Sequence, residues 1–94
     1  MEELFKNKTP NASDLIKYAE KRGWNMSQSK NGPIKFKDKN GIERLIIKKG
    51  SPRTIGSEMP HVEIKNSQGK RIDPYGVSVS KKSPKNHTPI NWDL

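Results

Sequence analysis

The sequence contains no cysteine and has few hydrophobic residues. Without cysteine, a disulfide framework, a thiolate nucleophile and a cysteine-based zinc site are all excluded. Only 29% of the 94 residues are hydrophobic, and no apolar run approaches the roughly 18–20 residues that a membrane span requires. The charged opening Met1-Glu2-Glu3 is unlike a secretory signal. We therefore expect one small domain over residues 1–94, with no membrane-spanning segment.

Acidic residues are also scarce relative to basic ones. Nineteen Lys and Arg residues stand against ten Asp and Glu residues, which gives a formal net charge of +9. The basic residues recur along the whole chain, so they do not form a single basic tail. Such a charge attracts phosphate polymers through counterion release. The composition therefore predicts contact with a nucleic acid, and the small core favours stabilisation by that ligand or by a tight-binding partner protein.

The chain has only two histidines, His61 and His87, which lie twenty-six positions apart. No acidic cluster accompanies either of them, so they form a weak set of metal ligands. We accordingly expect neither a metal site nor a cofactor.

The first half of the chain predicts a helix followed by a hairpin. Residues 1–10 have little pattern and are compatible with a flexible lead-in. Asn11 and Asp14 are typical of a helix start, and Gly23 is typical of a stop after a helix that ends at about Arg22. Apolar residues recur at helical spacing on one face of this segment, namely Ala12, Leu15, Ile16 and Ala19.

Alternating residues then indicate strands. A short strand is expected around Trp24 and Met26, and residues 34–37 and 42–48 form a hairpin through the Asn40-Gly41 turn. With the strands further along the chain, these elements predict an α+β fold in which an N-terminal helix packs on a twisted antiparallel sheet of about four to five strands. The loop after this hairpin contains Lys48, Lys49 and Arg53, which suit phosphate binding, although a basic surface connector has the same composition.

Residues 61–73 predict a second hairpin that carries chemical groups. Val62 and Ile64 should point into the core, which leaves His61, Glu63, Arg71 and Asp73 together on the solvent face. An imidazole, a carboxylate and a fixed cation are what phosphodiester cleavage by a 2′-hydroxyl needs. The alternative is that His61 simply follows Pro60 where a strand begins on the wet side of the sheet.

The tail adds a second imidazole among cations and hydroxyls. Lys82 and Lys85 precede His87, and Trp92 offers an aromatic ring that either packs or stacks on a base. If the tail folds back on the second hairpin, His61 and His87 form a complementary base and acid. Sequence spacing alone leaves that folding as an assumption.

At these residues the chain resembles the C-terminal toxin domains of contact-dependent inhibition and Rhs-type polymorphic bacterial toxins. Many of those domains are ribonucleases of the barnase/EndoU/colicin/RelE-like superfamily. The resemblance covers about the last third of the chain. It is carried by Pro60-His61-Val62-Glu63-Ile64, Gly69-Lys70-Arg71-Ile72-Asp73, Gly76, Val79, Lys82-Ser83-Pro84, His87, Pro89-Ile90 and Trp92-Asp93.

This resemblance implies a small α+β domain that cleaves RNA, typically tRNA, without a metal and leaves a 2′,3′-cyclic phosphate. It implies catalytic roles for His61, Arg71, His87 and Thr88. It also implies delivery within a secreted or cell-surface effector, action in the cytoplasm of a target cell, and neutralisation by an immunity protein, which the +9 charge suggests is acidic. The sequence starts at Met1 without a delivery region, which leaves open a free-standing protein or an excised domain.

Three other functions fit parts of the sequence. The first half resembles the small HicA-type mRNA interferases, in which a helix precedes a Gly-aromatic step, here Gly23-Trp24, and a basic hairpin with Lys35 and Lys37. A non-catalytic basic module that binds RNA or DNA fits the charge equally well. So does an inhibitor or adaptor that covers an acidic partner surface.

Overall fold

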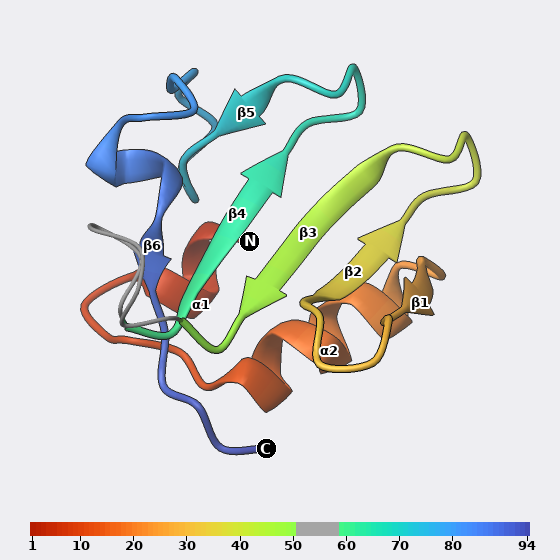
Figure 1. Ribbon diagram of the computed structural model, residues 1–94. Coiled ribbons are helices and arrows are strands. Elements are labelled where there is room, and N and C mark those ends of the chain that lie inside the picture. Colours follow the sequence, from red (N-terminus) through yellow and green to blue (C-terminus); the bar gives the residue numbers. More distant parts are fainter. Residues whose placement is uncertain (51–58) are drawn as a thin grey trace.

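The computed structural model describes residues 1–50 and 59–94. Figure 1 shows a twisted antiparallel sheet accompanied by two N-terminal helices. Within the described residues, the helices are α1 (Glu2–Phe5) and α2 (Ala12–Lys21), with a short 3₁₀ helix η1 (Pro84–Asn86). The strands are β1 (Asn25–Ser27), β2 (Ile34–Lys37), β3 (Glu43–Lys48), β4 (His61–Lys65), β5 (Arg71–Ile72) and β6 (Thr88–Pro89).

The α+β prediction is confirmed. The strands follow the order β1-β2-β3-β4-β5, and each pairs antiparallel with its neighbour. Strand β6, a two-residue segment of the tail that the sequence pattern does not mark, also pairs with β4. It pairs with the first half of β4 and β5 pairs with the second half. None of the helices in the described part of the chain is long and apolar enough to cross a membrane.

The two ends of helix α2 match the start signal at Asn11 and the stop signal at Gly23. The Asp14 side chain accepts a hydrogen bond of 3.0 Å from the backbone amide of Asn11, which satisfies one free donor at the helix start. Gly23 adopts a φ of +75° just after the helix, a conformation that glycine allows at no steric cost. The apolar face of the helix is fully buried at Ala12, Leu15 and Ala19. The predicted helix is therefore confirmed, with its last residue at Lys21.

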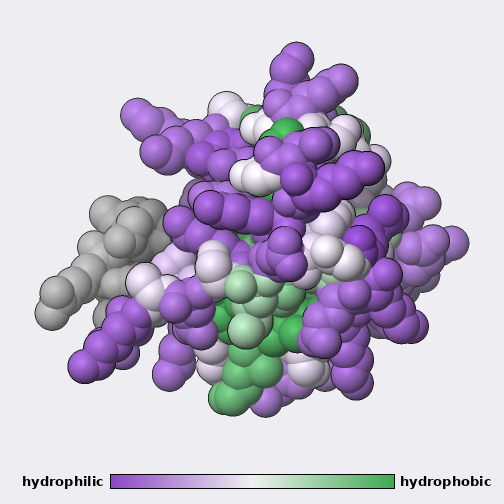
Figure 2. All heavy atoms as spheres, turned by 90° about the vertical axis from the view of Figure 1, so that its right-hand side faces the viewer, coloured by the Kyte–Doolittle hydropathy of each residue, from purple (hydrophilic) through white to green (hydrophobic). Residues whose placement is uncertain are grey.

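The core lies between the helices and one face of the sheet. Alternate residues of the three central strands point toward it, as a period of two requires. The segment 1–10 also contributes to this core through Phe5 of α1, and the tail contributes Ile90. The buried hydrophobic cluster consists of Phe5, Ala12, Leu15, Ala19, Ile34, Phe36, Leu45, Ile47, Val62, Ile64 and Ile90. The side of the molecule in Figure 2 is mainly hydrophilic, with a smaller hydrophobic area toward its lower edge.

The C-terminal tail is hydrogen-bonded to the start of α2. The amide of Asn91 donates to the carbonyl of Pro10 at 2.9 Å, and the amide of Ala12 donates to the carbonyl of Asn91 at 2.8 Å. The Asp93 carboxylate accepts hydrogen bonds from the Ser13 amide, at 3.0 Å, and from the Ser13 hydroxyl. A carboxylate in this position satisfies a free amide of the first helical turn and favours the positive end of the helix dipole.

Asp93 should make the stability of the fold dependent on acid pH. The hydrogen bond from the Ser13 hydroxyl and, to a smaller extent, the one from the Ser13 amide hold the pKa of Asp93 below its usual value. A carboxyl whose pKa is depressed by folding contributes stability above its unfolded pKa of about 3.9, and the contribution is lost as pH falls through the folded pKa. We expect the Tm of the wild-type chain to fall more steeply than that of Asp93→Asn between about pH 5 and pH 2 in circular dichroism melts. Parallel profiles would contradict this role.

The core also allows a matched pair of leucine truncations. Leu15 is fully buried, whereas Leu94 is 56% exposed. Leu15→Ala should lower the free energy of unfolding by about 2–5 kcal/mol, because it removes buried methyl groups and leaves a cavity. Leu94→Ala makes the same chemical change at the surface and should alter it by no more than about 0.5 kcal/mol. Urea unfolding of the two variants measures both values, and equal losses would be inconsistent with this core.

Candidate functional site

The face of the sheet opposite the core carries the polar groups that the sequence singles out. Val62 and Ile64 point into the core as expected, so the alternate residues His61 and Glu63 lie on the other face. Lys48 of β3 is directly opposite His61 in the register. On the other side of β4, Ile64 pairs with Ile72 and Lys65 pairs with Arg71, as the hairpin prediction requires.

Glu63 is the centre of this polar group. Its side chain is only 5% exposed, yet it receives three polar contacts from three different segments. Arg71 Nη1 of β5 lies 2.8 Å from Oε1, Lys48 Nζ of β3 lies 2.5 Å from Oε2, and Asn86 Nδ2 of η1 donates to Oε1 at 3.2 Å. Glu63 therefore joins β3, β5 and the tail to β4.

Glu63 remains ionised because its partners outweigh its burial. Burial alone raises the pKa of a carboxyl, since it disfavours the charged form. The hydrogen bond and charge of Lys48, the hydrogen bond from Asn86 and the charge of Arg71 act in the opposite direction, and the pKa of Glu63 lies below its usual value. The two cations are therefore engaged by the carboxylate and not directed freely into solvent.

His61 is buried, which corrects the expectation that it lies on the solvent face. Only 3% of the residue is exposed. The hairpin itself leaves this face open, but β6 pairs beside His61, with Pro89 directly opposite it, and the His87 ring lies over it at 5.0 Å between ring centroids. The tail therefore supplies the cover that the alternation of β4 does not reveal.

The neighbour of His61 identifies the tautomer of its neutral ring. Its Nδ1 lies 2.8 Å from the carbonyl oxygen of Met59, which only accepts hydrogen bonds. In the neutral ring Nδ1 must then carry the proton, and Nε2 presents a lone pair. That Nε2 is buried and has no hydrogen-bond partner among the described residues.

The folded-back tail brings His87 against His61, so the assumption about the tail is confirmed. The two rings meet edge to face, with an interplanar angle of 69°. His87 Nδ1 is also buried without a hydrogen-bond partner in the described ranges, whereas the residue as a whole remains partly exposed. The pair is thus reached from solvent on the His87 side.

Asn86 is the residue that the sequence interpretation missed. It is 1% exposed, and besides Glu63 its Nδ2 contacts the carbonyl of Lys81 at 3.1 Å. Asn86 is the last residue of η1, which is capped by the Ser83 hydroxyl through a hydrogen bond from the Lys85 amide and has Pro84 in its first position. The Ser83-Pro84 pair is a sequence signal for this turn, but nothing in the local sequence marks Asn86 as buried.

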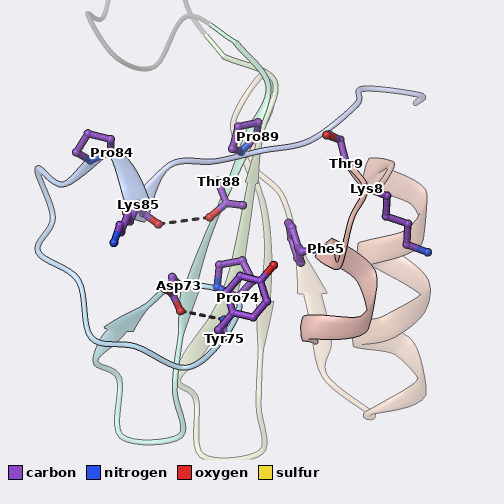
Figure 3. A pocket seen from close by; sticks show the side chains of 10 residues that line it. All are labelled: Phe5, Lys8, Thr9, Asp73, Pro74, Tyr75, Pro84, Lys85, Thr88 and Pro89. Atoms are coloured by element: carbon purple, nitrogen blue, oxygen red, sulfur yellow. Dashed lines mark hydrogen bonds between the residues drawn. The ribbon is translucent and has the colours of Figure 1, made fainter.

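Thr88 and Asp73 do not join the histidine pair, contrary to expectation. Thr88 pairs with Val62, so its side chain lies on the core side of the sheet, where its hydroxyl donates to the Lys85 carbonyl at 3.4 Å. Figure 3 shows it lining a separate cavity of about 570 Å³ between α1 and the tail. Asp73, which lies beside the same cavity, instead accepts hydrogen bonds from the amides of Tyr75 and Val77, both at 2.9 Å.

The predicted RNA-binding residues are dispersed. Lys49, Lys82 and Lys85 are exposed, as a phosphate contact requires, but Lys48 is engaged by Glu63. Trp92 is half-buried and packs against the core, which favours its packing role over stacking on a base. Arg53 lies outside the described residues.

Comparison with protein-family models finds no match for the chain, and comparison with curated proteins finds none either. The fold and the site define a small, basic α+β protein in which two histidines meet beside an ion-paired glutamate. Imidazoles whose ring nitrogens have no partner among the described residues can accept and donate protons, and they can also bind a metal ion.

Removing the cations around Glu63 should reveal their cooperation. We expect Lys48→Ala and Arg71→Ala each to destabilise the fold by about 1–3 kcal/mol, because a hydrogen bond to a buried charge is lost. The double variant should lose more than the sum, by about 1 kcal/mol, because the buried carboxylate then has neither cation.

Lys35→Ala provides the control for this cycle. Lys35 lies 3.7 Å from Glu43 in an ion pair that is more exposed than those of Glu63, and its removal should cost less than about 1 kcal/mol. Chemical denaturation of the four variants gives the coupling energy. Strict additivity of Lys48→Ala and Arg71→Ala would contradict a shared role at Glu63.

Proposed function

We propose that this protein is a metal-independent RNA endonuclease of the antibacterial toxin class, with tRNA as its expected target. The observation that carries the proposal is the contact between His61 and His87, which come from distant parts of the chain and meet near Glu63, the partner of Arg71 and Lys48. The net charge of +9 supports an RNA substrate, because it attracts the phosphate backbone.

The chemistry requires a base, an acid and stabilisation of charge on phosphorus. His61 suits the base, since hydrogen bonding of its Nδ1 to the Met59 carbonyl leaves the Nε2 lone pair available for the proton of a 2′-hydroxyl. His87, in its protonated form, would donate to the departing 5′-oxygen. The 2′-oxygen attacks the adjacent phosphorus, the P–O5′ bond breaks, and the products are a 2′,3′-cyclic phosphate and a free 5′-hydroxyl.

Cleavage also requires cations that contact the phosphates and access of the substrate to the buried His61. Arg71 is a candidate for stabilising the phosphorane, although its guanidinium also binds Glu63 at 2.8 Å. Exposed Lys82 and Lys85 precede His87 in the tail and suit contacts with neighbouring phosphates. Because His61 is buried, the scissile phosphate must reach the pair past His87, which requires the tail to shift on binding.

A cell that makes such an enzyme needs protection from it. An acidic immunity protein that covers the basic surface suits the +9 charge, and delivery in a larger effector to a target-cell cytoplasm is part of the same proposal. A basic module that only binds RNA is the second candidate. It is favoured by one observation, namely that Lys48 and Arg71 are already ion-paired with Glu63.

Single-histidine variants separate the two candidates. Wild-type protein should cleave RNA in EDTA, and His61→Ala or His87→Ala should reduce the rate by about 10²–10⁴-fold, since general acid–base catalysis contributes about that much. His61→Asn tests the same point more conservatively, because an amide can keep the hydrogen bond to Met59 while removing Nε2.

Lys39→Ala, in the exposed turn between β2 and β3, is the matched control and should retain the wild-type rate. Circular dichroism confirms that each variant is folded. RNA binding without any product would favour the binding module, and full activity in both histidine variants would exclude the proposed catalysis.

A further inference from the structure

The same two histidines, together with Glu63, have the composition of a metal site. One ligand atom from each of His61, Glu63 and His87 can be chosen so that all three lie within 4.8 Å of one another. His61 and Glu63 are buried, at 3% and 4% exposure. We propose that these residues bind a zinc-class transition-metal ion that switches the site off, which is a regulatory role resting on the proposed RNA cleavage.

The hydrogen bonding of the two histidine rings favours metal binding. A metal-binding histidine usually donates its other ring N–H to a carbonyl or carboxylate, which fixes the ring and directs a lone pair at the ion. His61 does this, because its Nδ1–H is held by the Met59 carbonyl and its Nε2 is buried without a partner among the described residues. His87 Nδ1 is equally unpartnered there. A buried lone pair without a donor is costly unless a ligand occupies it.

The carboxylate of Glu63 is also held in a fixed orientation by its neighbours. Arg71 and Asn86 both contact Oε1 of Glu63, which orients the group. Oε2 contacts only Lys48 among these neighbours, and the Lys48 side chain is 38% exposed. Lys48 can therefore withdraw into solvent on its flexible stem when an ion takes its place. The positive charge that remains nearby should limit the affinity, which suits a reversible regulator.

The donor set selects the class of ion. Two imidazoles and one carboxylate are typical ligands of Zn²⁺ and related transition metals, whereas Mg²⁺ and Ca²⁺ prefer oxygen ligands only. Bond lengths of about 2.0–2.2 Å place ligand atoms of a tetrahedral zinc site about 3.3 Å apart. Side-chain rotations that draw the ligand atoms together by at most roughly 1.5 Å would therefore complete the site.

Occupation of this site would block the proposed chemistry directly. The bound ion would use the Nε2 lone pair of His61 and the Nδ1 lone pair of His87, so neither ring could exchange the protons that cleavage requires. The effect should be reversed by a chelator, because the proposed reaction uses no metal ion.

Zinc binding can be measured independently of RNA cleavage. The protein must be free of a histidine tag, because the tag would itself bind Zn²⁺. The chain has only two histidines and no cysteine, so His61 and His87 are then its only imidazole ligands and no thiolate competes with them. Isothermal titration of metal-free protein with Zn²⁺ should give a stoichiometry of one, and Co²⁺ should give the visible absorption bands of a four-coordinate site. Excess Mg²⁺ should not compete.

Variants locate the site. His61→Asn, His87→Ala and Glu63→Gln should each weaken Zn²⁺ binding at least tenfold, and Lys39→Ala should leave it unchanged. Lys48→Ala should strengthen binding, because it removes the cation that competes for Oε2; a variant that merely loosened the fold would weaken it. Zinc binding absent from the wild type, or equal in the histidine variants and the wild type, would overturn the site.

An RNA cleavage assay with and without Zn²⁺ tests the proposed inhibition. Saturating Zn²⁺ should suppress RNA cleavage at least tenfold, and EDTA should restore it. Unchanged or increased cleavage at saturation would overturn inhibition. If zinc binds at the three residues but the chain cleaves no RNA in EDTA, the metal site stands, and both the proposed function and its inhibition fail.

Discussion

The buried carboxylate of Glu63 is the constraint on which the polar side of this protein depends. An ionised group at 4% exposure must find partners, because an unpaired buried charge is strongly destabilising. Here the partners arrive from three segments, with Lys48 on β3, Arg71 on β5 and Asn86 on η1. Satisfying one carboxylate therefore fixes how these segments sit against β4. A hydrophobic residue would fill the same space but could not select these partners.

This constraint also places the two histidines. His61 lies two positions before Glu63 on the same face of β4, and His87 directly follows Asn86, which the carboxylate holds. The far end of the tail is fixed separately by Asn91 and Asp93 at the start of α2. With both ends held, β6 lies along β4 and the His87 ring meets the His61 ring. The proposed cleavage and the proposed zinc site both follow from this meeting.

Much of the fold was predictable from the sequence because its signals are local. The cap at Asn11, the turn at Gly41 and the inward positions of Val62 and Ile64 depend on residues a few positions apart. The cover over His61 was not predictable, because alternation along a strand indicates a face but not what packs on that face. The same limit explains why Asn86 was missed, since its burial depends on a contact with β4 from twenty-three positions away.

The most direct test of the central claim is to incubate the tag-free protein with total tRNA in EDTA and to map the cut ends. The proposed role of the histidine pair gives discrete cuts that end in a 2′,3′-cyclic phosphate with wild-type protein, and a loss of these products with a folded His87→Ala variant. Intact tRNA with the wild type, or the same cuts at the same rate with His87→Ala, would contradict it.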